Sequence, residues 1–189
     1  YTGMDDEKII DLYWQRSQDA LAATQQKYGS YCHTIARNIL HDHQDAEECV
    51  NDALMRAWNA IPPQRPRHLP VFLGTITRNL ALDKYREAGR RKRGGGEAGL
   101  ALSELSECIA SRDSVEQAID EQELSASISR FLRALPEQKR NMFIRRYWHL
   151  YSAEDIAGQY GVSKNKVAVT LFRIRKALKE HLRKDGIAL

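Results

Sequence analysis

Basic side chains line one face of a predicted helix near the end of the chain. Val167 begins an apolar series in steps of three and four residues, which is typical of the buried face of a helix. Lys164 and Lys166 on the opposite face fall in the first turn, where a positive charge opposes the helix dipole at about 0.3–1 kcal/mol each. A bound polyanion offsets that cost, so the pattern favours nucleic-acid binding over a solvated basic face. The apolar series continues through Leu171, Ile174, Leu178 and Leu182, and the basic face also carries Arg173, Arg175, Lys176 and Lys179.

The residues before this helix have the spacing of a helix-turn-helix. Ala157 is small enough for two helices to cross closely, and Gly161 can take the positive φ that the turn requires. Ser163 is predicted to cap the second helix, while Ser152 with Asp155 resembles a capping box for the first. The segment 152–184 therefore predicts a DNA-binding motif.

Two histidines and the acids that follow them have the residue types of a metal site. Zinc prefers three or four converging ligands, with histidines usually three or four positions apart on one helix. His41 and His43 are only two apart in a predicted turn, and acids at the start of the next helix suit its dipole. We expect no metal and no cofactor, and the rival interpretation, a metal-dependent enzyme acting through His41 and His43, lacks a ligand set. The sequence also shows no glycine-rich phosphate loop or nucleophile motif, so neither catalysis nor a small-molecule substrate is expected.

Composition limits the remaining possibilities. At 189 residues with 42% hydrophobic content, the chain can form one or two cores. Its apolar runs are too short to span a membrane and no secretory signal is visible, which favours a cytoplasmic protein without membrane insertion. The three cysteines are widely spaced, so no disulfide framework is expected, and Cys49 is interpreted as a small core residue. We interpret residues 1–3, which precede Met4, as an expression remnant.

Charge is unevenly distributed along the chain. Residues 78–93 hold seven basic residues against two acids, and residues 164–184 hold eight against one. Between them, residues 97–124 hold eight acids against one arginine. Two basic blocks separated by an acidic segment predict two nucleic-acid contacts on one chain.

The elements that position these residues are all predicted to be helices. Residues 45–61 form the most regular amphipathic pattern, and prolines from Pro62 to Pro70 end it. A further helix at about 69–88 ends in a basic cluster, and three glycines from Gly94 mark a flexible boundary. We therefore predict an all-α chain of two helical domains, 4–93 and 125–189, joined by a flexible acidic linker at 94–124. Helix within that segment is expected from about Ser114.

A polar stripe shares one face of the helix at 69–88. Asn79, Asp83 and Arg86 follow in steps of four and three, and the stripe leads into the basic residues 90–93. A stabilising surface network would explain the stripe alone. Nonspecific phosphate contact would explain the basic end.

Three blocks of the sequence occur in the order found in bacterial sigma factors. The block from Asp45, DAEECVNDALMRAW, resembles their core-binding helix, and the block from Phe72, FLGTITRNLALDKYR, resembles their promoter-melting segment. The block from Leu132 to Leu182 resembles their C-terminal helix-turn-helix domain. With two domains and no third between them, the chain is similar to an extracytoplasmic-function (ECF) sigma factor of the sigma-70 family.

The resemblance implies a transcription initiation factor that binds core RNA polymerase and directs it to promoters, reading −10 and −35 elements and helping to open the DNA. It also implies an anti-sigma factor as a partner. The acidic linker would thread toward the polymerase active site, whereas composition alone fits a solvated spacer equally well. By position in the motifs, the polymerase-binding candidates are Asp45, Glu48, Asn51, Asp52 and Arg56. The −10 candidates are Asn79, Asp83, Lys84, Arg86, Arg90, Arg91 and Arg93, and the −35 candidates are Ser163, Lys164, Asn165, Lys166, Arg173, Arg175 and Lys176.

Three positions depart from the family pattern. Asn51 stands where glutamine is usual, Lys166 where threonine is frequent, and Gly74 where tryptophan is common. Because of the change at Lys166, the promoter preference of the family is not transferred to this chain. The alternative is a free-standing helix-turn-helix transcriptional regulator, which would have no need of the blocks in the first 93 residues.

Overall fold

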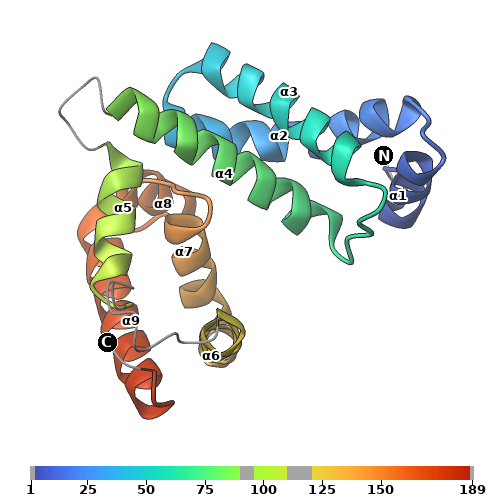
Figure 1. The fold of residues 1–189 in the computed structure, drawn as a ribbon. Helices are drawn as coiled ribbons and strands as arrows, with labels where there is room; N and C mark the ends of the chain where they lie inside the picture. Colours follow the sequence, from blue (N-terminus) through green and yellow to red (C-terminus); the bar gives the residue numbers. More distant parts are fainter. Residues whose placement is uncertain (1–2, 90–95, 110–120, 188–189) are drawn as a thin grey trace. The chain divides into compact units, whose positions relative to one another are not determined.

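The computed structural model describes residues 3–89, 96–109 and 121–187, and the chain divides into two compact units, Tyr1–Gly94 and Gly95–Leu189. Every regular element in these ranges is an α-helix (Figure 1). The prediction of an all-α chain with two helical domains is confirmed for the described residues.

The described part of unit 1 contains four helices: α1 (Asp6–Trp14), α2 (Asp19–Leu40), α3 (His43–Ala60) and α4 (Leu69–Gly89). Helices α2, α3 and α4 pack against one another, and α1 packs on α2 (Figure 1). A buried hydrogen bond of 2.8 Å between the Tyr13 and Thr24 hydroxyls joins α1 to α2. The core of this unit includes Ile9, Tyr13, Ile35, Ile39, Cys49, Leu69 and Leu73.

The amphipathic pattern of α3 has the predicted outcome. Asp42 caps the helix, because its Oδ1 accepts a 2.8 Å hydrogen bond from the Asp45 amide. Cys49 is fully buried, as predicted, and lies with small and branched apolar residues against α2 and α4. The polar residues of α3 consequently face outward. The buried residues of this helix are Ala46, Cys49, Val50, Ala53 and Ala57.

Helices α2 and α4 approach closely at Gly74. A Cβ atom at this buried position would lie 2.7 Å from the Tyr31 Oη, far inside van der Waals contact. Glycine therefore lets the two backbones approach beside a tyrosine ring, which gives the departure at this position a local packing reason.

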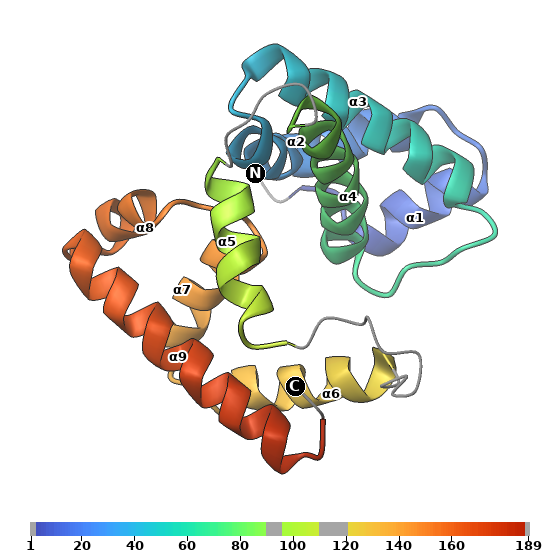
Figure 2. The same cartoon turned by 60° about the vertical axis from the view of Figure 1, so that its left-hand side comes forward.

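Unit 2 contains α5 (Glu97–Ser106), α6 (Glu121–Ala134), α7 (Glu137–Tyr147), α8 (Ala153–Tyr160) and α9 (Lys164–Lys184). The long α9 contacts α6, α7 and α8, as Figure 2 shows. All five residues of its predicted apolar series are buried. Helix α5 falls in the stretch predicted as a linker and was not predicted, while the helix start expected at Ser114 lies outside the described residues.

The helix-turn-helix forms between α8 and α9 as predicted. Gly161 ends α8 with a φ of 63°, and the Ser163 Oγ accepts a 3.1 Å hydrogen bond from the Lys166 amide. Ser152 caps α8 by accepting a 3.0 Å hydrogen bond from the Asp155 amide. The two serine caps fix the first turn of each helix, and the left-handed glycine ends α8.

Within the residues that the structure describes, no helix combines the length and the apolar character that crossing a membrane requires.

Candidate nucleic-acid interface

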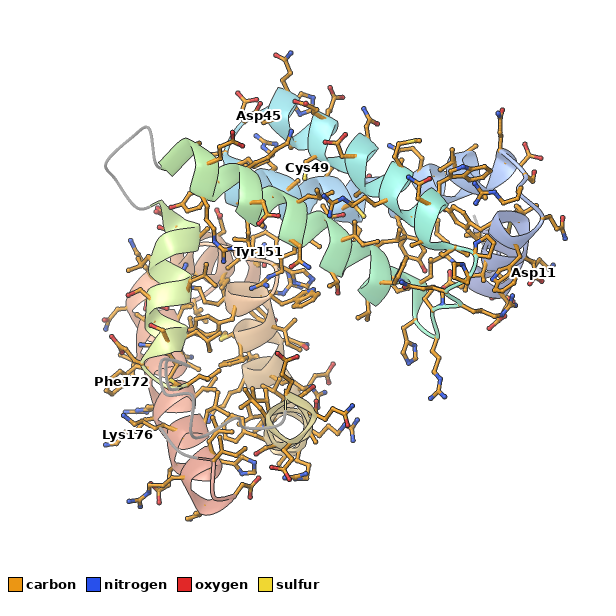
Figure 3. The ribbon with its side chains drawn as sticks, in the orientation of Figure 1. Asp11, Asp45, Cys49, Tyr151, Phe172 and Lys176 are labelled. Atoms are coloured by element: carbon orange, nitrogen blue, oxygen red, sulfur yellow. The ribbon has the colours of Figure 1, made fainter. Side chains whose placement is uncertain are left out.

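The first turn of α9 presents an exposed basic surface. Ser163, Lys164, Asn165 and Lys166 are all exposed, and the Ser163 cap holds the turn in place. Backbone amides at a helix N-terminus favour anions, and the two lysines add to that field. Arg173 and Lys176 are exposed further along the helix, where Lys176 points away from the body of unit 2 (Figure 3). Six of the seven −35 candidates are therefore exposed.

Arg175 is the exception, and the prediction that it lies on the exposed basic face is wrong. Its side chain is 13% exposed, and its Nη1 donates a 2.6 Å hydrogen bond to the Tyr147 Oη. The same nitrogen lies 3.4 Å from Glu104 Oε2 on α5. Arg175 lies four residues after Leu171 and three before Leu178, so helical periodicity places it beside the buried series, where it contacts α5 and α7.

Two apolar side chains on the open face of α9 were not predicted as functional. Phe172 is 57% exposed and Val169 is also exposed, and Phe172 points outward beside Lys176 (Figure 3). An aromatic residue outside the buried series of a helix has no core to enter, and this is the signal that could have identified it. Apolar side chains in a DNA groove can contact the methyl group of thymine.

A buried arginine joins α5 to α7 behind this face. Arg146 is 2% exposed, and its guanidinium donates hydrogen bonds to Glu97 Oε2 at 2.9 Å and Glu104 Oε1 at 3.2 Å. Burial opposes its charge, but the hydrogen bonds that Arg146 donates to Glu104 and Glu97 outweigh burial and raise the pKa of Arg146. Burial also raises the pKa of the Tyr147 phenol, whose O–H group donates a 3.0 Å hydrogen bond to Glu104 Oε2. We refer to Glu97, Glu104, Arg146, Tyr147 and Arg175 as the α5 clasp.

The outer face of α3 carries the polymerase-binding candidates. Asp45, Glu48, Asn51, Asp52 and Arg56 are all exposed, and Figure 3 shows Asp45 at the start of the helix, directed outward. Met55 lies among them with half of its surface exposed. The face combines hydrogen-bonding groups of both charges with one apolar contact, which suits a protein partner.

The described −10 candidates lie on α4. Asn79, Asp83 and Arg86 are exposed, and Arg86 Nη1 lies 3.8 Å from Asp83 Oδ1. Lys84 is partly buried, and its Nζ lies 3.2 Å from Glu48 Oε2 on α3. This ion pair connects the −10 candidates on α4 with the polymerase-binding candidates on α3. Arg90, Arg91 and Arg93 lie outside the described residues.

One further arginine on α4 belongs to this region. Arg78 is partly buried, and burial together with the neighbouring charge of Arg86 lowers its pKa. Arg78 was not among the predicted residues, because it does not share the helix face of Asn79, Asp83 and Arg86.

The histidines near the start of α3 do not assemble a ligand set. His43 stacks edge-on against His33 with ring centroids 4.8 Å apart, and its Nε2 lies 3.7 Å from Glu47 Oε1. Among residues 3–89, 96–109 and 121–187, no group of three or more metal-ligating side chains has the geometry to hold an ion. His33, His43 and Glu47 instead line a polar groove of about 460 Å³ between α2 and α3.

Two parts of the sequence match known families. Residues 25–91 match the family described as Sigma-70 region 2, and residues 125–178 match the family described as Sigma-70, region 4. The first match contains α3 and α4, and the second contains α7, α8 and most of α9. The polar faces of α3, α4 and α9 therefore lie inside the matched regions.

Several curated proteins resemble the chain over most of its length. "Probable RNA polymerase sigma factor RfaY" of Xanthomonas campestris is 29% identical over 86% of this chain, and the matched part is 42% of that protein. The ECF RNA polymerase sigma factor SigE of Mycolicibacterium smegmatis is 26% identical over 80% of this chain and 57% of its own length. The ECF RNA polymerase sigma factor SigW of Bacillus subtilis is 25% identical over 94% of this chain and 96% of its own. The chain thus spans about half the length of the first two relatives and nearly all of the third.

Proposed function

Since this chain belongs to the sigma-70 family, as an ECF sigma factor, we propose that it binds core RNA polymerase and directs it to specific promoters. It acts by binding, reads −10 and −35 elements and helps to open the DNA, while the polymerase supplies the chemistry. Its place of action is the cytoplasm, where the polymerase works.

The observation that carries the proposal is the presence of polar, outward faces on both units. A free-standing regulator needs the helix-turn-helix of α8 and α9, but it has no use for the exposed candidates on α3. A promoter-specificity subunit needs both, because one face holds the polymerase and the other holds DNA. The family matches lie over the same two regions.

Helix α9 would enter the major groove of the −35 element. The exposed first turn, Ser163 to Lys166, is placed to meet base edges, and the later cations Arg173 and Lys176 are placed to meet phosphates. Phe172 and Val169 would add apolar contacts to thymine methyl groups.

The −10 element would be read by α4 and the basic cluster that follows it. A single-stranded base captured outside the duplex needs polar groups to hydrogen-bond its edge and cations to hold its phosphates. Asn79, Asp83 and Arg86 offer exposed polar groups of these kinds. The resemblance further implies an anti-sigma factor as a partner, to which we assign no surface.

In vitro transcription with core polymerase tests the proposal. The protein is expected to co-purify with core enzyme and to give start sites that share two sequence elements upstream. It is expected to bind free duplex only weakly, because each DNA surface is small. Tight, sequence-specific duplex binding by the protein alone, without any association with polymerase, would instead establish a free-standing regulator.

A further inference from the structure

The polar groove between α2 and α3 encloses a histidine nitrogen that has no partner. The Nε2 of His33 is buried, and it makes no hydrogen bond within residues 3–89, 96–109 and 121–187. Buried polar atoms in proteins are nearly always hydrogen-bonded, so an unpaired one at the wall of a groove points to a partner from outside. The groove measures about 460 Å³, and a water molecule takes about 30 Å³ in the liquid, so a long side chain has room to enter.

Hydrogen-bond acceptors predominate in the lining of this groove. Glu47 supplies a carboxylate, and none of the described residues that line the groove is a lysine or an arginine. The Thr34 hydroxyl donates its proton to the Ser30 carbonyl at 2.9 Å, so its oxygen is left to accept. The lining therefore suits a cation that donates several hydrogen bonds. Its other polar side chains include Gln25, His33, His43 and Asn51.

An arginine side chain has the chemistry that the groove requires. Its planar guanidinium carries five N–H donors and no acceptor, and two of these donors match a carboxylate. Glu47 is available for such a pair, because the nearby His43 Nε2 lies 3.7 Å from its Oε1, too far for a hydrogen bond. A further N–H can donate to the His33 Nε2 when that ring carries its proton on Nδ1.

The groove is continuous with the face of α3 that we propose for polymerase binding. Asn51 belongs to both, since it lines the groove and is one of the polymerase-binding candidates. Helix α3 exposes four acids against the single arginine Arg56, so its charge favours a basic protein partner over DNA. The four acids are Asp45, Glu47, Glu48 and Asp52.

We infer that the groove receives an arginine side chain of core RNA polymerase, with the Glu47 carboxylate and the His33 Nε2 as acceptors. The inference rests on the proposed function, because it adds one specific contact to the polymerase-binding surface. That surface then extends from α3 onto α2, where no polymerase-binding residue was predicted.

His33→Phe separates binding from folding. The variant keeps an aromatic ring and removes the unpaired nitrogen, so the midpoint of thermal unfolding of the free protein is expected to stay equal or to rise. Its affinity for core polymerase, measured by fluorescence anisotropy of the labelled full chain, is expected to fall about tenfold through loss of one hydrogen bond to a charged group. His68→Phe makes the same change on an exposed histidine outside the groove and is expected to retain the affinity. Unchanged affinity of His33→Phe, or an equal loss in His68→Phe, would overturn the inference.

A double-mutant cycle tests whether His33 and Glu47 share one partner. Two acceptors of the same guanidinium are coupled, so His33→Phe combined with Glu47→Gln is expected to lose less affinity than the product of the two single losses. Glu48→Gln is the matched acid, because it lies on α3 but does not line the groove. Its loss is expected to multiply with that of His33→Phe. Multiplication in both cycles would overturn a common partner for His33 and Glu47.

Thr34→Arg occupies the groove from within and does not depend on the fold of the His33 variant. The new guanidinium is expected to pair with Glu47 and to lower the affinity for core polymerase at least tenfold. Thr75→Arg on α4 is the matched control, because Thr75 is also partly buried and its hydroxyl also donates to the carbonyl four residues earlier, at 2.7 Å. Equal affinities of the two variants would overturn the inference.

Photocross-linking identifies the occupant directly. A benzophenone side chain in place of the exposed Ser30 at the groove is expected to attach to a polymerase segment beside an arginine. Attachment only to a segment without arginine would overturn the inference. If the unmodified chain does not associate with core polymerase, the proposed function fails and the inference fails with it. If the chain associates but the His33 and Thr34 variants behave like their controls, the inference alone is overturned.

Discussion

Lys84 on α4 and Glu48 on α3 form an ion pair of 3.2 Å, so a residue predicted for DNA contacts one predicted for polymerase. Glu48 remains largely exposed, and Lys84 is more enclosed. Exposed pairs of this kind contribute little to folding, about 0–1 kcal/mol. Substitution of either residue is therefore expected to affect its binding function more than the folding stability of unit 1.

Reversal of charge on α3 should weaken polymerase binding. Glu48→Lys and Arg56→Glu are each expected to lower the affinity for core enzyme at least tenfold, about 1.4 kcal/mol, because both side chains lie on the exposed face of α3 that we propose for polymerase binding. Quantitative co-purification or anisotropy with labelled protein measures the loss. Asp5→Lys is the control reversal on an exposed residue away from α3, and an equal loss there would remove the support for this face.

Removal of exposed cations from α9 should weaken promoter use without affecting polymerase binding. Lys166→Ala and Arg173→Ala are each expected to reduce −35-dependent transcription and, where a phosphate contact is lost, to lower the salt slope by about 0.9. In vitro transcription and co-purification are measured on the same preparations. Loss of polymerase binding by both variants would show that the face has been misassigned.

Phe172→Ala should separate DNA binding from stability. Because Phe172 is mostly exposed, its truncation is expected to change the free energy of unfolding by no more than about 0.5 kcal/mol. Loss of an apolar base contact is expected to lower promoter discrimination, because the ring no longer contacts a thymine methyl group. Unfolding curves and competition between promoter and mutated promoter measure the two effects. A large loss of stability with unchanged discrimination would count against a base contact.

Arg146→Ala should destabilise unit 2 strongly. Removal of one partner from a buried ion cluster usually costs 3–5 kcal/mol, and partial exposure of Glu97 and Glu104 places this case near about 3 kcal/mol. Calorimetry resolves the transition of unit 2 from that of unit 1. Arg133→Ala, an exposed residue of the same unit, is expected to remain within about 0.5 kcal/mol of the unmodified protein, and similar values for the two would exclude a stabilising role for the cluster.

His149 should make unit 2 less stable in mild acid. Burial and the nearby charge of Arg145 lower the pKa of His149, so the folded state binds its proton less readily than the unfolded state. Stability is expected to fall as the pH drops below about 6.5, the ordinary value for histidine, because unfolding then takes up a proton. Thermal unfolding between pH 7.5 and 5.5 measures this loss. His149→Gln is expected to reduce the pH dependence, and an unchanged profile in that variant would assign the effect to other groups.

Local patterns predicted those elements whose signals lie within one helix. The apolar series of α9, the Ser163 cap and the positive φ of Gly161 follow from nearby residues, and all three are present. The exposed polar face of α3 follows in the same way, because a capped amphipathic helix leaves its polar side outward.

Features that depend on distant partners were not predicted. Helix α5 is short and contains Gly99, and its acids are held by Arg146, more than 40 positions along the chain. Arg175 turns toward Tyr147 and Glu104, which are 28 and 71 positions away. The contact of α5 with unit 2 could not be read from local patterns, whereas the position of Arg175 four residues after Leu171 and three before Leu178 was a local signal that it borders the buried series.

The contact between Gly74 and Tyr31 has an evolutionary consequence. A side chain at position 74 would occupy the volume of the Tyr31 hydroxyl, since even a Cβ would lie 2.7 Å from it. A larger residue at position 74 therefore requires Tyr31 to be displaced or replaced by a smaller residue. Homologues are expected to show covariation of this pair across α2 and α4, with glycine inherited together with tyrosine.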